Sequence, residues 1–285
     1  HKTATTYIQN QFMANRQLLE DAGVSQIPLA VFRPWRRAAL AGKSIGAKDA
    51  RGPFNHLCAE WNPRGNPVLL ISDENMIGTS NRIVREGRLY AALSSKLGRA
   101  AAMLADHSIT IYISVRRYAS YYAAIYCDAL RSRERGPFRD FATRLYPVAR
   151  RWPQVLADIA TLFPTTPITV WPYESFRQKE AAIFGAIVGE AAASEMELSG
   201  AIMRPSMSQK AVATVEALGG TIGWRAASYS IPAVEGYYSP ARGHAVFAPW
   251  TEEQKSFFTA LYREDIADIM ANPRYKFLGS AELIS

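Results

Sequence analysis

The stretch SITIYISV (residues 108–115) is the strongest strand signal in the chain, because β-branched and aromatic residues fill it. Two further apolar runs, PVLLIS (67–72) and PITVW (167–171), also predict buried strands. A stretch with helical periodicity follows each of the three runs. Strands that alternate with helices predict an α/β fold, in which a mostly parallel central sheet is covered by helices on both faces.

The rest of the chain is predicted from helical periodicity and turn residues. We expect helices at about 5–22, 82–105, 118–132, 176–189, 208–218 and 251–271, one or two helices within 31–66, and helical structure through residues 152–163. A loop rich in Gly, Ser, Tyr and Pro is expected over 219–249. No repeat, low-complexity segment or linker is evident, so we expect one three-layer α/β/α domain over residues 1–285.

Composition narrows the classes of protein. With 285 residues, 48% of them hydrophobic, the chain is able to bury a full core. No run of about 18 apolar residues occurs, so no membrane span is expected, and no signal peptide is evident. Cys58 and Cys127 lack metal-ligand spacing and are expected to be buried free thiols of a cytoplasmic protein.

The net charge of +8 favours anionic partners such as nucleotides or acidic glycans. The arginines occur in small groups without a continuous basic stripe, so nucleic acid is not an expected partner. The three predicted strands end in Asp73-Glu74, Arg116-Arg117 and Pro172-Tyr173-Glu174. Ligands of parallel α/β sheets bind outside the carboxyl ends of the strands, so these charged groups predict a site at that edge.

The segment HKTATTYIQ (1–9) places Lys2, Thr5 and Thr6 at a helix start. Unpaired backbone amides, hydroxyl groups and a lysine together suit a phosphate or sulfate. The alternative interpretation is an ordinary polar helix start capped by threonine. The segment AGKS (41–44) is not expected to bind nucleotide, because Arg37 stands where a Walker loop needs glycine.

HKTATTYIQ resembles the 5′-phosphosulfate loop of sulfotransferases that use 3′-phosphoadenosine 5′-phosphosulfate (PAPS). Lys2, Thr3, Thr5 and Thr6 match that loop, and Ala4 stands where the family usually has glycine. The strand that leads into the loop in the family would precede residue 1. Alanine is able to replace the glycine without strain if its φ is negative.

Three further segments follow in the order of the family. ISVRRYASYYAAIY (113–126) is similar to its 3′-phosphate segment, in which an arginine, here Arg116, is followed eight residues later by serine. Ala124 occupies that position, so we expect Ser120, one helical turn earlier, to substitute. LLISDEN (69–75) resembles a strand-end S-x-E segment whose glutamate, here Glu74, is the catalytic base. WPYESF (171–176) and RPSMS (204–208) resemble later elements, and Tyr173 and Glu174 are expected to be structural.

The resemblance implies a P-loop-like sulfotransferase fold and sulfuryl transfer from PAPS to an acceptor hydroxyl, without a metal. It implies that Glu74 and Lys2 take part in catalysis. The residues implied to bind the cofactor are Lys2, Thr3, Ala4, Thr5, Thr6, Arg116 and Ser120. The S-x-E segment favours a glycan acceptor over another small molecule, and aromatic and basic residues of 31–66 and 219–249 are candidates to line its cleft.

Two alternatives remain open, and the oligomeric state is not predicted. Ala4 and Ala124 favour a non-catalytic protein of the same fold that binds a nucleotide or another anionic partner. A small-molecule kinase is disfavoured, because neither a Walker loop nor a metal-binding pair of acids is evident.

Overall fold

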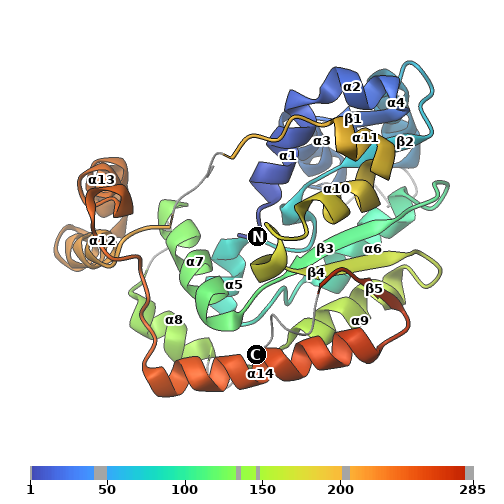
Figure 1. Ribbon diagram of the computed structural model, residues 1–285. Coiled ribbons are helices and arrows are strands. Elements are labelled where there is room, and N and C mark those ends of the chain that lie inside the picture. Colours follow the sequence, from blue (N-terminus) through green and yellow to red (C-terminus); the bar gives the residue numbers. More distant parts are fainter. Residues whose placement is uncertain (1, 42–49, 133–135, 146–147, 201–205, 280–285) are drawn as a thin grey trace.

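The computed structural model describes residues 2–41, 50–132, 136–145, 148–200 and 206–279 (Figure 1). Residues 42–44 of AGKS and residues 204–205 of RPSMS lie outside the described segments, so the structure does not address either motif in full.

Within these segments, five strands form two parallel sheets (Figure 1). The first sheet pairs β1 (Val24–Ile27) with β2 (Val68–Ile71). The second has the order β3 (Ile111–Val115), β4 (Ile168–Pro172), β5 (Tyr275–Phe277). All three pairings are parallel, so the mixed α/β class and the parallel strand direction are confirmed.

Three strands lie where the apolar runs predicted them, but β1 and β5 were not predicted. β1 has the sequence VSQI, whose central residues are polar and yet buried. Ser25 donates its hydroxyl to Asn62 Oδ1 at 2.8 Å, which satisfies one of these polar groups. β5 has only three residues and is held by its pairing with β4. Tertiary contacts therefore create both strands, and neither carries a local signal.

Helices make up most of the rest of the fold. They are α1 (Thr5–Ala14), α2 (Arg16–Asp21), α3 (Leu29–Ala41), α4 (Arg51–Trp61), α5 (Ser80–Glu86), α6 (Leu93–Met103), α7 (Tyr118–Arg131), α8 (Phe138–Leu145), α9 (Trp152–Leu162), α10 (Glu180–Val188), α11 (Glu190–Glu195), α12 (Gln209–Ile222), α13 (Trp224–Tyr237) and α14 (Glu252–Ala271), with 3₁₀ turns η1 (Glu74–Met76), η2 (Tyr173–Ser175) and η3 (Pro240–Arg242). None of the described helices combines the length and apolar character needed to cross a bilayer.

The structure corrects three helix predictions. The expected loop 219–249 contains α13, whose residues Ala227 and Ile231, four positions apart, form a buried face. The expected helix 5–22 is interrupted at Asn15, whose amide group donates to Gln11 O at 2.9 Å and Glu197 O at 3.0 Å. The expected helix 82–105 is divided by Gly87, which ends α5 with a φ of 59°.

Helices cover both faces of the strands, because alternate strand residues pack into different hydrophobic clusters. Leu69 and Ile71 of β2 contact the cluster of α3 and α4, whereas Leu70 contacts the cluster of α1, α10 and α11. Tyr112 of β3 contacts the same cluster as Leu70, and the residues on either side of Tyr112 contact the largest cluster, around α7, α9 and α14.

The expected single central sheet is not observed in the described segments, where β2 pairs only with β1 and β3 only with β4. The two sheets share the cluster that Leu70 and Tyr112 contact. β2 and β3 are more exposed than β1 and β4.

The aromatic residues of α7 belong to the core. The side chains of Tyr118, Tyr121, Tyr122 and Tyr126 are at most 1% exposed, so their rings pack in the core and are not available to stack on a ligand. Both cysteines are free thiols, and Cys127 is buried while Cys58 is partly exposed. Figure 1 shows α12 and α13 side by side at one end of the molecule, apart from both sheets.

Candidate functional site

The chain forms an anion-binding backbone shape where it enters α1. Lys2 has a φ of 56° and Ala4 a φ of 63°, whereas Thr3 between them has no positive φ. Such an alternation turns successive backbone amides toward one point, which is the geometry of an anion-binding nest. The first helical amide bond runs from Ile8 to Ala4 O at 3.0 Å, so the amides of residues 5–7 have no acceptor within the helix. The N-cap Ala4 has no side-chain group to accept them.

Ala4 does not have the negative φ that would let alanine replace glycine without strain. Its φ is positive and its ψ is 9°, which places it in the left-handed region that glycine occupies without strain. An alanine in this region costs about 1–2 kcal/mol. Strained backbone of this kind concentrates at binding sites, where surrounding contacts hold it in place.

We therefore expect Ala4→Gly to stabilise the protein by up to about 1 kcal/mol, since removal of left-handed strain outweighs the greater freedom of glycine in the unfolded chain. Urea unfolding measures the change. Ala22→Gly is the matched control, because Ala22 has a φ of −82° and should lose stability instead. Equal destabilisation by both substitutions would contradict the assignment of strain to Ala4.

Arg116 brings a cation to this loop. It follows β3 directly, and its Nη1 donates to the carbonyl oxygen of Lys2 at 2.5 Å. Its Nε donates to Ser120 Oγ at 3.1 Å, and its guanidinium lies 4.3 Å from the ring centroid of Tyr173. The sequence-predicted residues Lys2, Arg116 and Ser120 are thus brought together.

The Arg116 guanidinium has no carboxylate within ion-pairing distance in the described part of the chain. Burial lowers the pKa of Arg116 below its ordinary value, although nearby tyrosines and Glu174 partly offset this effect. A partly buried cation without a counter-ion favours an anionic ligand, because the ligand would restore the charge balance lost with water. Ala124 is buried at 5% exposure, so the helix turn of Ser120 is the one that meets Arg116.

Glu74 lies at the end of β2 as the first residue of η1. Its Oε1 accepts from Arg33 Nη2 at 2.9 Å, whereas its Oε2 is buried without a hydrogen-bond partner. Burial raises the pKa of Glu74, but its own backbone amide and the charge of Arg33 outweigh burial and leave the pKa below its ordinary value. Glu74 is therefore ionised at neutral pH, and its buried Oε2 has no hydrogen-bond donor among the described residues.

Two arginines of α3 hold the acidic pair at the end of β2. Asp73, whose side chain is fully buried, accepts from Arg33 at 2.8 Å and from Arg36 at 3.0 Å. Asp73 also caps η1 by accepting from the amide of Asn75 at 3.0 Å. Both arginines lie in the segment 31–66, whose basic residues were candidates to line the acceptor cleft, but their contacts with Asp73 and Glu74 were not predicted. Their spacing of three residues on a helix was the available signal.

Side-chain contacts connect the end of β2 with the helix α1. Gln9 of α1 donates to Ser72 at both its carbonyl oxygen, at 3.0 Å, and its hydroxyl, at 3.1 Å. The helix that starts at the loop is thereby tied to the strand end that carries Glu74.

Tyr90 is a buried tyrosine that was not predicted to have a role. Its hydroxyl is 2.8 Å from that of Tyr121, and burial, together with the charge of Glu74, raises the pKa of Tyr90. Its φ of 42° is strained, and its ring packs on Gly78, where an added Cβ would approach the ring to 2.7 Å. No local sequence pattern marks Tyr90, because its position depends on these distant contacts.

Glu174 has a structural role, as expected. Its Oε1 accepts from the amide of Arg117 and its Oε2 from the hydroxyl of Tyr262, both at 2.9 Å. The carboxylate thereby joins the ends of β3 and β4 to α14. Tyr173, expected to be structural as well, instead presents its ring to Arg116.

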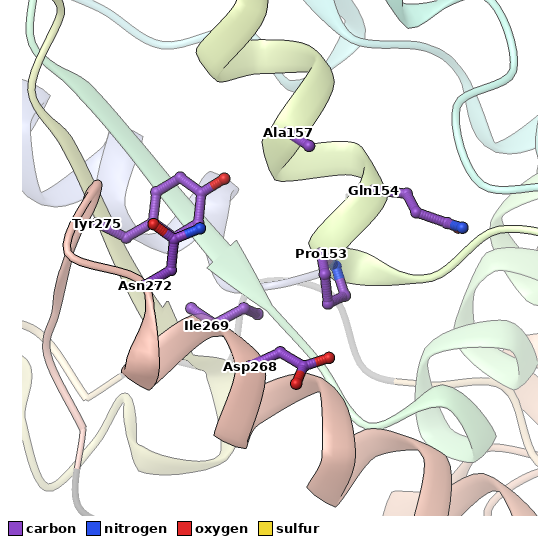
Figure 2. A pocket seen from close by; sticks show the side chains of 7 residues that line it. All are labelled: Pro153, Gln154, Ala157, Asp268, Ile269, Asn272 and Tyr275. Atoms are coloured by element: carbon purple, nitrogen blue, oxygen red, sulfur yellow. The ribbon is translucent and has the colours of Figure 1, made fainter.

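A pocket of about 290 Å³ lies elsewhere, between α9 and α14 (Figure 2). Figure 2 shows Pro153 and Ala157 on one side and Asp268 and Ile269 on the other. Tyr275, the first residue of β5, also lines it, so it opens near the amino ends of the parallel strands. The strand-end residues described above lie at the carboxyl ends, and this pocket is not part of their site.

Among the described residues, no group of three or more His, Cys, Asp or Glu side chains is arranged to hold a metal ion. Comparisons of the chain with protein-family models, curated proteins and solved structures found no match.

Proposed function

We propose that this protein transfers a sulfuryl group from PAPS to the hydroxyl of an acceptor. The observation that carries the proposal is the contact between Arg116, a cation without a carboxylate partner in the described segments, and the backbone loop that starts α1. Two anion-binding elements from distant parts of the sequence meet there. Such a pair suits a donor that carries two separate phosphate groups.

The residues present fit such a donor. Lys2, Thr5, Thr6 and the free amides of α1 would bind the 5′-phosphosulfate, because a helix N-terminus stabilises negative charge. Thr3 and Ala4 would contribute the intervening backbone. Arg116, with Ser120 bound to its Nε, would bind the 3′-phosphate.

Glu74 would act as the general base. The acceptor hydroxyl oxygen forms a bond to sulfur as the bond between sulfur and the 5′-phosphate oxygen breaks, and Glu74 takes the hydroxyl proton. The products are a sulfate ester and 3′-phosphoadenosine 5′-phosphate (PAP). Lys2 and the loop amides stabilise the charge that develops on the leaving phosphate oxygen. Positioning and charge stabilisation supply most of the catalysis in transfers of this type.

The finer features of the fold and the acceptor belong to the same proposal. The helices on both strand faces support a three-layer, P-loop-like sulfotransferase fold. A carbohydrate acceptor is proposed from the S-x-E segment Ser72-Asp73-Glu74.

Calorimetric titration with PAP tests the donor site directly. We expect PAP to bind at least tenfold more tightly than AMP, which lacks the 3′-phosphate, because a hydrogen bond to a charged group contributes about 1.5–3 kcal/mol. ATP with Mg²⁺ is the control for a kinase. Absence of PAP binding, or equal affinity for PAP and AMP, would contradict the proposal.

A non-catalytic protein that binds a nucleotide or another anion is the second candidate. The strain at Ala4 and the neutralisation of Glu74 by Arg33 favour it. PAP binding without sulfuryl transfer to any acceptor in a screen of sugars, phenols and amines would select this candidate.

A further inference from the structure

Lys96 is a half-buried cation close to the candidate base. It lies on α6, three residues after Leu93 and four before Ala100, whose side chains are 0% and 2% exposed. This spacing places Lys96 at the border of the buried helix face. In the described part of the chain, no carboxylate forms an ion pair with it.

The charges around Lys96 are mainly positive. Burial lowers the pKa of Lys96, and the neighbouring Arg36, Arg82 and Arg99 lower it further, while Asp73 acts in the opposite direction. Arg36 is already bound to Asp73 at 3.0 Å. Arg82 is bound to Glu86 at 2.6 Å. The pairs at Arg36 and Arg82 therefore leave Lys96 as a charge without a counter-ion among the described side chains.

The helix that carries Lys96 packs next to the turn that carries Glu74. α6 packs against η1, the turn that carries Glu74, and Met76 of η1 contacts the clusters to which α6 contributes. Arg36, which lowers the pKa of Lys96, shares Asp73 with Arg33, the partner of Glu74. Lys96 thus lies on a helix that packs beside the acidic pair, on an element separate from Arg116 and the loop that starts α1.

We infer that the acceptor is an anionic sugar whose carboxylate or sulfate group binds Lys96 while its hydroxyl faces Glu74. This inference rests on the proposed function for the role of Glu74. An anionic group supplies the counter-ion that Lys96 lacks, and a half-buried ion pair is screened by salt less than an exposed one. A neutral sugar would leave Lys96 unpaired, so the site discriminates by charge.

Amine acetylation followed by peptide mass spectrometry tests this site. Each sugar, namely glucuronate, glucose 6-sulfate or neutral glucose, is added to the full chain at matched ionic strength. We expect both anionic sugars to slow acetylation of Lys96 at least threefold relative to glucose. Lys276, an exposed lysine of β5, is the internal control and should react equally in every sample.

Saturation-transfer NMR with glucuronate provides the second measurement. Lys96→Gln should reduce the signal at least threefold, Lys96→Arg should retain it, and Lys276→Gln should leave it unchanged. Thermal unfolding and PAP titration of the same samples check the fold and the donor site.

The outcomes separate the two proposals. Equal acetylation with all three sugars, or an equal NMR signal from Lys96→Gln and Lys276→Gln, overturns the inference. Protection by inorganic sulfate as strong as that by the sugars also overturns it, because the site would then take a free anion. PAP binding without sugar protection rejects this inference alone, whereas sugar protection without PAP binding rejects the donor site and leaves an anionic-sugar site.

Discussion

Glu74→Gln should lower the rate of sulfuryl transfer by about 10²–10⁴-fold, since a general base contributes this much to proton transfer. Glutamine has nearly the same shape, and its carbonyl oxygen is able to accept the bond that Arg33 Nη2 makes to Glu74. The fold and the affinity for PAP should therefore be unchanged. Steady-state kinetics with a sulfated product readout and PAP titration measure the two quantities.

Glu86→Gln is the matched control for this experiment. Glu86 resembles Glu74 in that one oxygen pairs with an arginine, Arg82, and the other is buried without a hydrogen-bond partner. It lies on α5 and should not affect the rate. Lys2→Ala should also abolish transfer, because Lys2 stabilises the leaving phosphate. Full activity of both Glu74→Gln and Lys2→Ala would remove these residues from the mechanism.

The pH profile gives a further check on Glu74. Because Arg33 contributes to the lowered pKa of Glu74, the base becomes active at a lower pH than an ordinary glutamate would. Arg33→Gln removes that charge, so the pKa of Glu74 should rise and the acidic limb of kcat/KM should move to higher pH. If the acidic limb of kcat/KM stays at the same pH in Arg33→Gln, a group other than Glu74 controls that limb.

Arg116→Gln should weaken PAP binding by about 1.5–3 kcal/mol, which corresponds to about 10–150-fold in Kd. Arg116 donates to the loop backbone at the carbonyl oxygen of Lys2, and glutamine retains a donor but not the charge. Affinity for AMP should change much less, since AMP lacks the 3′-phosphate that Arg116 is proposed to bind. Calorimetric titration of both nucleotides separates this specific loss from a general distortion.

Arg117→Gln is the control for Arg116. Arg117 is the next residue, its side chain is exposed, and its contact with Glu174 runs through the backbone amide, which the substitution retains. It should bind PAP as the wild type does. Equal losses in the two variants would indicate that net charge, and not the position of Arg116, controls binding.

The sequence predicted those parts of the fold that have local signals. The run 108–115 contains β3. α14 lies within the expected range 251–271, and Thr251 caps it by accepting from the amide of Gln254. The prediction of a loop over 219–249 was wrong. The segment is rich in Gly, Ser, Tyr and Pro, which favour loops, although it contains α13 with its buried face. β1 has polar central residues, so its burial follows from pairing and from Asn62 and not from its own pattern.

The candidate site shows the same division. The placement of Glu74 and Arg116 after strands was readable from the chain, because a residue that follows a parallel strand must lie at the carboxyl edge of the sheet. Arg33 and Tyr90 were not predicted, since each reaches the site through contacts with residues remote in sequence.

By itself, the sequence determined three of the five described strands, most helices and the residue types at the ends of those three strands, since these depend on side-chain periodicity and on capping over a few residues. Only the tertiary structure decided that the strands form two sheets, that Ala4 is left-handed, that Arg33 lowers the pKa of Glu74 and that Lys96 lacks a counter-ion among the described residues. These properties depend on distances between groups far apart in the chain, and local patterns carry no information about such distances.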